Sequence, residues 1–200
     1  MEPKPQTYWN NFMNNETYKT FENWVGKSDA NSKLYFYEYI KDKNYNSILD
    51  IGCGDATIFQ GLQNNNININ YTGVDSCKYF VDMAKKNNIN IIQSDIRKIN
   101  ASDSSYDIVF GRHVIEHQPE LESLLNEMIR LSIKECVHIF FIKPIEGDNN
   151  YINYSSKEDL YHNTYCINNI KRLLDNNPKV DKYKFEDINH KENMLIINLK

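Results

Sequence analysis

The chain has 200 residues, of which 40% are hydrophobic and 25% charged, with a formal net charge of −4. This size and composition indicate one globular domain rather than two domains or a disordered chain. The negative net charge disfavours a nucleic-acid partner, because a polyphosphate backbone is bound by positive charge. Every apolar stretch is shorter than the about 20 residues that cross a bilayer, so a membrane partner is not expected.

The chain start and the cysteines indicate the compartment. The polar start, MEPKPQTYWNN, lacks the apolar segment of a secretory signal. Cys53, Cys77, Cys136 and Cys166 are far apart and form no C-x-x-C pair, which removes the usual support for a zinc finger or a redox motif. Reduced thiols and a cytoplasmic location are therefore expected.

Apolar periodicity predicts strands that alternate with helices. Helices are expected over 17–24, 32–41, 57–63, 77–86, 119–131 and 167–175, and strands over 47–51, 71–75, 89–94, 106–111, 136–142, 183–189 and 193–199. The alternation predicts an α/β fold with a doubly wound, mostly parallel seven-stranded sheet. Only the short turn 190–192 joins the last two strands, so one of them is expected to run against the sheet.

Glycines and carboxylates follow four successive strands, at the edge of the sheet where open α/β folds bind ligands. They are Asp50, Gly52 and Gly54, then Asp75, then Asp95, and then Gly111 with Arg112 and His113. The dinucleotide pattern G-x-G-x-x-G is incomplete, because its third glycine position holds Thr57. Asp50 and Asp55 would also repel a pyrophosphate, by roughly 3 kcal/mol per charge pair at 5 Å and an effective dielectric constant of 20. A ligand with an ammonium and a sulfonium, S-adenosylmethionine, would be attracted.

Four segments carry a family resemblance. ILDIGCGDA (48–56) resembles motif I of the class I S-adenosylmethionine-dependent methyltransferases. The segments 71–75, 91–96 and 106–117 resemble the later motifs in the same order, so the resemblance covers about residues 45–145. It implies a Rossmann-like fold whose last strand is antiparallel, with S-adenosylmethionine as cofactor. One departure is Ala56, where many members have glycine.

The resemblance also implies cofactor-binding roles. The methionyl end of the cofactor would contact Asp50, the loop Gly52-Cys53-Gly54, and Gly111 with Arg112. Asp75, with Ser76 beside it, would accept hydrogen bonds from the ribose hydroxyls. Asp95 would accept from the adenine amine, and the backbone N–H of Ile96 would donate to the adenine ring.

We expect a single methyltransferase domain over 1–200, in four parts. Residues 1–44 form an N-terminal helical cap, 45–145 the cofactor-binding core, 143–166 a substrate loop, and 167–200 a C-terminal helix with antiparallel strands. The cap is rich in aromatic residues, which either cover the cofactor or pack on the sheet edge: Tyr8, Trp9, Phe12, Phe21 and Trp24.

A hydroxyl acceptor must lose a proton, and a histidine is suited to accept it near neutral pH. His113 is predicted to face the cleft as this base; its alternative role is a contact to the cofactor loop. His117 is expected to have a structural role. Residues 113–117 also match the zinc pattern H-x-x-E-H, but no third ligand accompanies them, so no metal is expected.

The segment 143–166 is long for a connection in a compact domain, and such segments are functional or disordered. Its aromatic side chains are predicted to surround a polar, ring-shaped acceptor such as a sugar, with His162 as the alternative base. These side chains are Tyr151, Tyr154, Tyr161 and Tyr165. The alternative is a partly helical surface lid with ordinary tyrosines.

Three functions therefore remain in consideration. The first is metal-independent methyl transfer to a small polar acceptor, foremost a sugar or glycan-precursor hydroxyl. The second is methylation of a protein or RNA, and the third is a non-catalytic module that binds S-adenosylmethionine. The expected assembly is a monomer or a homodimer.

Overall fold

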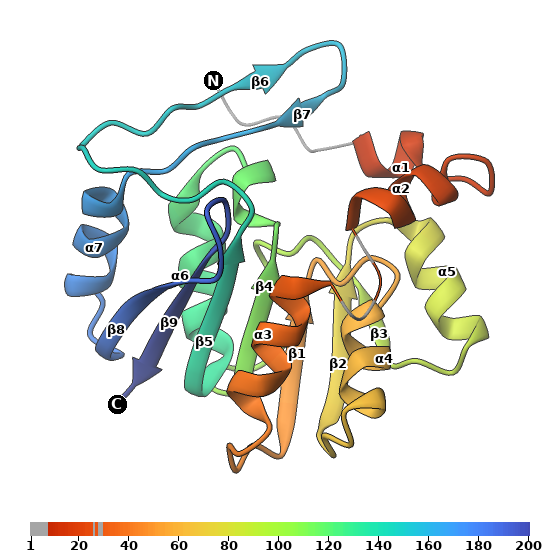
Figure 1. Cartoon of the computed structure of the whole chain (residues 1–200), viewed down its shortest axis with the longest axis horizontal. Coiled ribbons are helices and arrows are strands. Elements are labelled where there is room, and N and C mark those ends of the chain that lie inside the picture. The colour runs from red at the N-terminus through yellow and green to blue at the C-terminus, as the bar shows by residue number, and fades with distance from the viewer. Residues whose placement is uncertain (1–7, 26, 28–29) are drawn as a thin grey trace.

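The computed structural model describes residues 8–25, 27 and 30–200, and its centre is one seven-stranded sheet (Figure 1). The strands lie in the order β3-β2-β1-β4-β5-β9-β8. Their bounds are β1 Ser47–Ile51, β2 Asn70–Asp75, β3 Ile91–Gln93, β4 Tyr106–Arg112, β5 Ser132–Phe140, β8 Val180–Asp187 and β9 Asn193–Leu199. The helices are α1 Tyr8–Phe12, α2 Tyr18–Val25, α3 Asn31–Ile40, α4 Thr57–Asn64, α5 Lys78–Lys86, η1 Ile115–His117, α6 Leu121–Leu131 and α7 Ile167–Asp175.

The direction of the strands agrees with the prediction. β1 to β5 pair in parallel, whereas β9 pairs antiparallel with both β5 and β8. The doubly wound, mostly parallel seven-stranded sheet with its last strand antiparallel is therefore confirmed. Because β8 runs with the parallel strands, the β8–β9 turn returns to the same edge as the ends of β1, β2 and β4.

Alternate residues of each strand bury opposite faces of the sheet, as a sheet covered by helices on both sides requires. Ile48 and Ile108 pack with residues of α3, α4 and α5. Leu49 and Val109 pack with residues of α6 and α7 on the other face. The result is a three-layer α/β/α arrangement with helices on both faces of the sheet (Figure 1).

The fifth strand differs from its predicted bounds of 136–142. It begins at Ser132, directly after α6, where the Ser132 Oγ donates to the Met128 carbonyl (2.8 Å). It ends at Phe140 because the next two amides, of Phe141 and Ile142, donate to the Glu116 carboxylate instead (2.7 and 3.4 Å). The sequence around residue 132 is polar, which hid the strand start.

The segment 143–166 is a long strap across the top of the molecule rather than a partly helical lid. It contains the two-stranded hairpin β6 Tyr154–Ser155 and β7 Leu160–Tyr161. Figure 1 shows this hairpin and the helices α1 and α2 above the upper edge of the sheet. Residues 1–7 of the expected N-terminal cap and the side chain of Trp24 lie outside the described residues. Within the described ranges, no helix combines the length and apolarity needed to cross a membrane.

Packing of α4 against α3 gives a test of the fold. A Cβ on Gly61 would lie 1.9 Å from the Tyr37 hydroxyl, and Tyr37 is fully buried. At a solvent-exposed position of a helix, a change from glycine to alanine stabilises the protein by about 0.5–1 kcal/mol. Here we expect Gly61→Ala to lower the free energy of unfolding by about 1–3 kcal/mol, because the core is overpacked. Urea denaturation measures the difference.

The matched control is Gln60→Ala, on the exposed side of the same helix. Its free energy of unfolding should stay within about 0.5 kcal/mol of the wild-type value. A stabilised Gly61→Ala protein would show that α3 and α4 do not pack in this way.

Candidate active site

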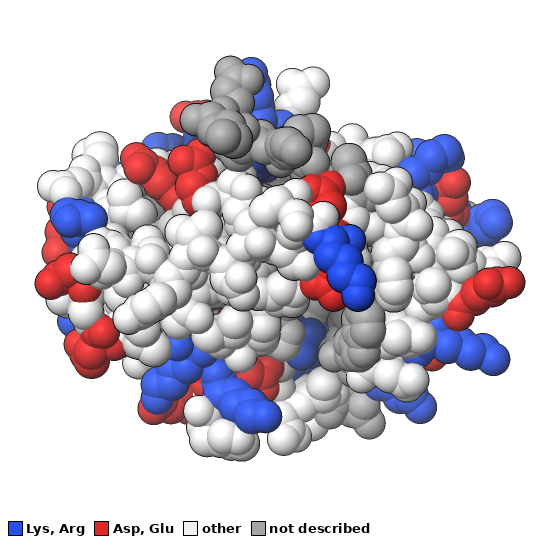
Figure 2. All heavy atoms as spheres, turned by 90° about the horizontal axis from the view of Figure 1, so that it is seen from above, with Lys and Arg blue, Asp and Glu red and all other residues white. Residues whose placement is uncertain are grey.

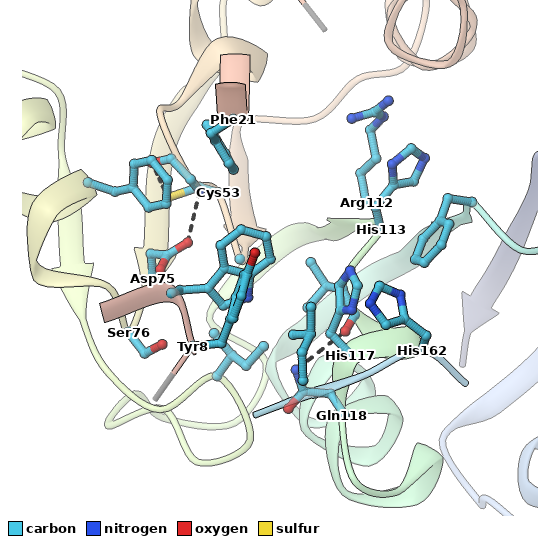
Figure 3. A pocket seen from close by; sticks show the side chains of 18 of the residues that line it. Tyr8, Phe21, Cys53, Asp75, Ser76, Arg112, His113, His117, Gln118 and His162 are labelled. Carbon is cyan, nitrogen blue, oxygen red and sulfur yellow. Dashed lines mark hydrogen bonds between the residues drawn. The ribbon is translucent and has the colours of Figure 1, made fainter. Parts of the chain in front are cut away.

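A cavity of about 1140 Å³ opens at the head of the sheet, where the ends of β1, β2 and β4 meet the strap, α1, α2 and the β8–β9 turn (Figure 3). Ten of the predicted site residues line it: Gly52, Cys53, Gly54, Asp75, Ser76, Asp95, Ile96, Arg112, His113 and His162. Six lie outside its lining: Asp50, Gly111, Tyr151, Tyr154, Tyr161 and Tyr165. The volume exceeds the roughly 300–1,000 Å³ typical of a pocket for one small ligand, so two small molecules can fit.

The glycine loop after β1 forms the floor of one half of the cavity. Gly52 and Gly54 have φ of 67° and 53°, and a Cβ on Gly52 would lie 2.5 Å from Val114. Ala56 also has a positive φ, of 57°, which explains why glycine is usual at that position in the family that the sequence resembles. The chain therefore accepts some backbone strain there to keep the loop tight.

Asp75 ties this loop to the end of β2. Its Oδ2 accepts the Gly54 N–H (2.9 Å), and its Oδ1 accepts the Cys77 N–H (2.8 Å). Burial raises the pKa of Asp75, although these two backbone bonds oppose the shift. A carboxylate has about four acceptor positions, so Asp75 can still accept bonds from a ligand in the cavity.

Asp95 lies at the cavity edge after β3 and is already paired. Arg97 donates to it from Nε (3.0 Å), from Nη2 (2.6 Å) and from its backbone N–H (2.9 Å). The Arg97 guanidinium thereby lowers the pKa of Asp95. The predicted acceptor for an adenine amine thus has a fixed orientation and remains ionised.

Asp50 lies behind the glycine loop, 2% exposed, and accepts a hydrogen bond from the Tyr71 hydroxyl (2.7 Å). Burial raises the pKa of Asp50 to about 7, while Tyr71 and the nearby Lys33 act in the opposite direction. Gly111 also lies beneath the surface, since a Cβ there would lie 3.1 Å from the His138 ring.

Lys33 is a buried cation that the sequence analysis missed. It is 1% exposed, and its Nζ donates to the Thr57 hydroxyl. The neighbouring Asp55 accepts from the Thr57 N–H (3.3 Å) and from the Tyr18 hydroxyl (3.1 Å). Lys33 begins an i, i+3, i+4, i+7 stripe with Phe36, Tyr37 and Ile40, which is the signal that could have revealed its burial.

A second polar group joins β4 to the β8–β9 turn. Arg112 donates from Nε to the Ser32 hydroxyl (2.9 Å), and its Nη2 lies 3.8 Å from Glu192 Oε1. His113 Nε2 lies 2.8 Å from the same oxygen. Burial acts to raise the pKa of Glu192, but His113, Ser32 and Asn189 outweigh it and bring the pKa to about 2. Glu192 was missed because the sequence shows only a short turn there.

The other half of the cavity lies between η1 and the strap. His117 Nδ1 lies 2.7 Å from the Tyr161 carbonyl oxygen, and the His117 ring stacks on Phe141. Trp9 and His162 contact the same ring edge-on. Figure 3 shows His117 and His162 together, with Asp75 and Ser76 across the cavity and Tyr8 between them in this view.

The predicted substrate tyrosines have other positions. Tyr165 is buried, and its hydroxyl contacts the carbonyl oxygens of Ile115 and Gln118 (3.2 and 3.3 Å). Tyr151 and Tyr154 are exposed on the strap, and Tyr161 pairs its ring with Tyr154. Aromatic residues of the N-terminal helices line the cavity instead, namely Tyr8, Trp9 and Phe21.

Within residues 8–25, 27 and 30–200, no cluster of three or more His, Cys, Asp and Glu side chains has a metal-binding arrangement. His113 and His117, the two histidines of the zinc-like pattern, bond instead to Glu192 and to the Tyr161 carbonyl.

Comparison with known proteins identifies the core. A family model described as "Methyltransferase domain" matches residues 49–140. Residues 49–140 therefore resemble a methyltransferase domain. The prediction that this protein is a methyltransferase is confirmed. No sequence among the curated proteins matches this chain.

Several solved structures resemble the chain over nearly its whole length. The PH0226 protein from Pyrococcus horikoshii OT3 is 16% identical, with a TM-score of 0.66 and coverage of 97% of this chain and 96% of that one. The magnesium protoporphyrin IX methyltransferase ChlM from Synechocystis PCC 6803, with bound SAH, is 13% identical, with a TM-score of 0.67 and coverage of 98% and 100%. The plantazolicin methyltransferase BpumL, in complex with a pentazolic desmethylPZN analog and SAH, is 17% identical, with a TM-score of 0.66 and coverage of 98% and 95%. At these identities the likeness shows a common fold.

The shifted carboxyl group of Asp50 gives a pH test. Between the usual pKa of about 4 and the folded value of about 7, the folded protein holds a proton that the unfolded chain has released. The contribution of Asp50 to the free energy of unfolding should therefore fall as the pH rises through this window. Asp50→Asn lacks the titrating group, so its free energy of unfolding should gain on that of the wild type as the pH rises from about 4 to 7. Urea denaturation of the ligand-free protein from pH 4.5 to 8 measures both curves.

The control variant is Asp82→Asn, whose carboxylate is exposed and pairs with Lys78 on α5. Its pH dependence should follow the wild type over the same window. Parallel curves for wild type and Asp50→Asn would contradict the shifted titration.

Proposed function

We propose that this protein transfers the methyl group of S-adenosylmethionine to a hydroxyl of a small polar acceptor, foremost a sugar or a glycan precursor. The supporting observation is one cavity with two unlike halves, a glycine-and-carboxylate half and a half lined by histidine and aromatic rings. The first half suits the cofactor and the second an acceptor, because the reacting groups must meet in one enclosed space.

The residues of the first half fit the cofactor chemically. Asp75 has acceptor positions left for ribose hydroxyls, and Asp95 has them for an amine. The methionyl end of S-adenosylmethionine carries both an ammonium and a carboxylate. Its pocket here has both signs of charge, with Arg112 and Glu192 in the lining and Asp50 and Lys33 behind it. When bound, S-adenosylmethionine supplies a methyl group activated by a positively charged sulfur.

The second half suits a ring with polar edges. Trp9 and Phe141 supply apolar faces, while Gln118, Glu158 and His162 supply hydrogen-bonding groups around them. Aromatic faces with polar partners match the alternating apolar faces and hydroxyl edges of a sugar. His113 and His162, which the sequence predicts as candidate bases, both line this cavity.

Two alternatives receive less support. Protein or RNA as acceptor would need an open or basic surface, whereas the net charge is −4. Figure 2 shows the face above the sheet, where Lys and Arg side chains among the described residues are scattered between Asp and Glu. A non-catalytic module would need no acceptor space, and a cavity of about 1140 Å³, with room for two small molecules, disfavours it. We further propose a cytoplasmic monomer or homodimer that acts without a metal.

Titration calorimetry with S-adenosylhomocysteine tests the cofactor half. Asp75→Ala should weaken its binding by about 1.5–3 kcal/mol, because a charged acceptor is lost and the Gly54 loop loses its anchor. The control is Asp82→Ala, which removes an equal charge from the exposed side of α5 and should leave binding unchanged. Absence of binding to the wild type would refute the proposed cofactor.

Transfer of a radioactive methyl group tests the acceptor. The panel should contain free monosaccharides, nucleoside diphosphate sugars, a simple phenol, a lysine-containing peptide and a short RNA. We expect label in a sugar member of the panel, at a hydroxyl. Label in the peptide or the RNA alone would replace the proposed acceptor, and binding of S-adenosylmethionine without any transfer would support the non-catalytic module.

A further inference from the structure

Four of the five histidines of the chain line the cavity, namely His113, His117, His162 and His190. Each imidazole has one nitrogen next to its own backbone, Nδ1, and one at the far end of the ring, Nε2. A base that receives a proton from a bound acceptor needs a free lone pair, and the far nitrogen reaches the acceptor most easily. The hydrogen bonds of each ring therefore decide which histidine can act.

His113 uses its far nitrogen for the protein. Glu192 has a pKa of about 2 and is ionised, so its Oε1 can only accept, and His113 Nε2 must carry the proton in their 2.8 Å contact. The lone pair of neutral His113 is then on Nδ1, beside its own main chain. The contact instead holds the β8–β9 turn against the end of β4.

His117 has the opposite arrangement. Its Nδ1 lies 2.7 Å from the Tyr161 carbonyl oxygen, and a carbonyl oxygen only accepts, so the proton is on Nδ1. In the neutral ring the lone pair is therefore on Nε2, the far nitrogen. Such a bond from one nitrogen to a carbonyl is the usual way in which proteins select the tautomer of a functional imidazole.

The His117 ring is also held in place on several sides. Phe141 stacks on it at a centroid distance of 5.2 Å and an interplanar angle of 26°. Trp9 and His162 meet it edge-on at 5.9 and 5.2 Å. In contrast, the described contacts include no hydrogen bond to the ring of His162, so neither of its tautomers is selected.

Glu116 fixes the strap that carries the Tyr161 carbonyl. Its buried carboxylate accepts the Phe141 N–H (2.7 Å), and its main-chain carbonyl accepts the Asn163 N–H (2.9 Å). The chain is thereby bound to η1, which also carries His117, directly before the strap at Phe141 and near the far end of the strap at Asn163. These two hydrogen bonds of Glu116, rather than a loose loop, set the distance between Tyr161 and His117.

We propose that His117 is the general base of the reaction and that the Tyr161 carbonyl positions it for a hydroxyl acceptor. This inference rests on the proposed function. In the step, the acceptor oxygen forms a bond to the methyl carbon and the bond from methyl carbon to sulfur breaks, with its electron pair left on sulfur. The hydroxyl proton moves to His117 Nε2.

The charge state agrees with this role. Burial lowers the pKa of His117, and His162 acts in the same direction, while the Tyr161 carbonyl and the Glu116 carboxylate oppose the shift. The ring is thus neutral at pH 7 and has its lone pair available. A fixed base is needed for a hydroxyl, whose proton must leave, whereas an amine acceptor only has to arrive uncharged.

Nitrogen-15 NMR of the histidine rings tests the tautomer without any acceptor. The protein is uniformly labelled and saturated with S-adenosylhomocysteine, and His117→Gln assigns the signal. We expect the wild-type ring at pH 7.5 to carry its proton on Nδ1 with Nε2 unprotonated. A proton on Nε2, or a doubly protonated ring at that pH, overturns the proposal and leaves the proposed function untouched.

Kinetics with the sugar hydroxyl acceptor of the transfer assay test the role in the reaction. His117→Gln should lower kcat by about 10²- to 10⁴-fold, keep the affinity for S-adenosylhomocysteine, and abolish the fall of kcat at acidic pH. His117→Ala should regain part of its rate when imidazole is added. His162→Gln, the comparison at the neighbouring ring, should keep the acidic limb of the profile.

An unchanged acidic limb in His117→Gln, or its loss in His162→Gln alone, would overturn the assignment to His117. Failure of the wild-type protein to bind S-adenosylhomocysteine would instead contradict the proposed function. The calorimetric and kinetic results thus distinguish the two failures.

Discussion

One buried carboxylate, Glu116, holds together the half of the cavity that is proposed for the acceptor. It has no exposed surface, and its Oε1 accepts the amide of Phe141 where β5 ends. Burial acts to raise the pKa of Glu116, but the nearby His138 ring keeps it below its usual value, so the group remains ionised. A buried carboxylate is costly unless it is bonded, and here its bonds fix where the strap leaves the sheet.

The main chain of Glu116 also binds the strap. The Glu116 main-chain carbonyl binds the far end of the strap at Asn163, and the Asn163 side chain donates to the Gln118 carbonyl (2.7 Å). The short helix that follows β4 therefore holds the chain just before the strap, at Phe141, and near the end of the strap, at Asn163. These contacts are made by the protein alone, and such a fixed arrangement would favour accurate alignment in the proposed displacement reaction.

The cofactor half depends on balanced charge rather than on an excess of one sign. Lys33 lies close to Asp50 and Asp55, and Arg112 lies close to Glu192. A molecule with an ammonium and a carboxylate at one end meets both signs in such surroundings. The repulsion of a diphosphate that the sequence predicts from Asp50 and Asp55 is weakened in the structure, because burial raises the pKa of both carboxyl groups and Lys33 lies close to them.

The sequence by itself determined the sheet, the glycine loop and the carboxylates at the strand ends. These features are local, because the alternation of apolar residues and the position of Gly52, Gly54 and Asp75 are set by neighbours in the chain. Only the tertiary structure decided how distant residues combine. Lys33 meets Thr57, and His113 meets Glu192 across 79 positions. In the strap, Tyr151 and Tyr154 are exposed and Tyr165 is buried. His117 contacts a backbone carbonyl, a partner that the identity of the residue does not reveal.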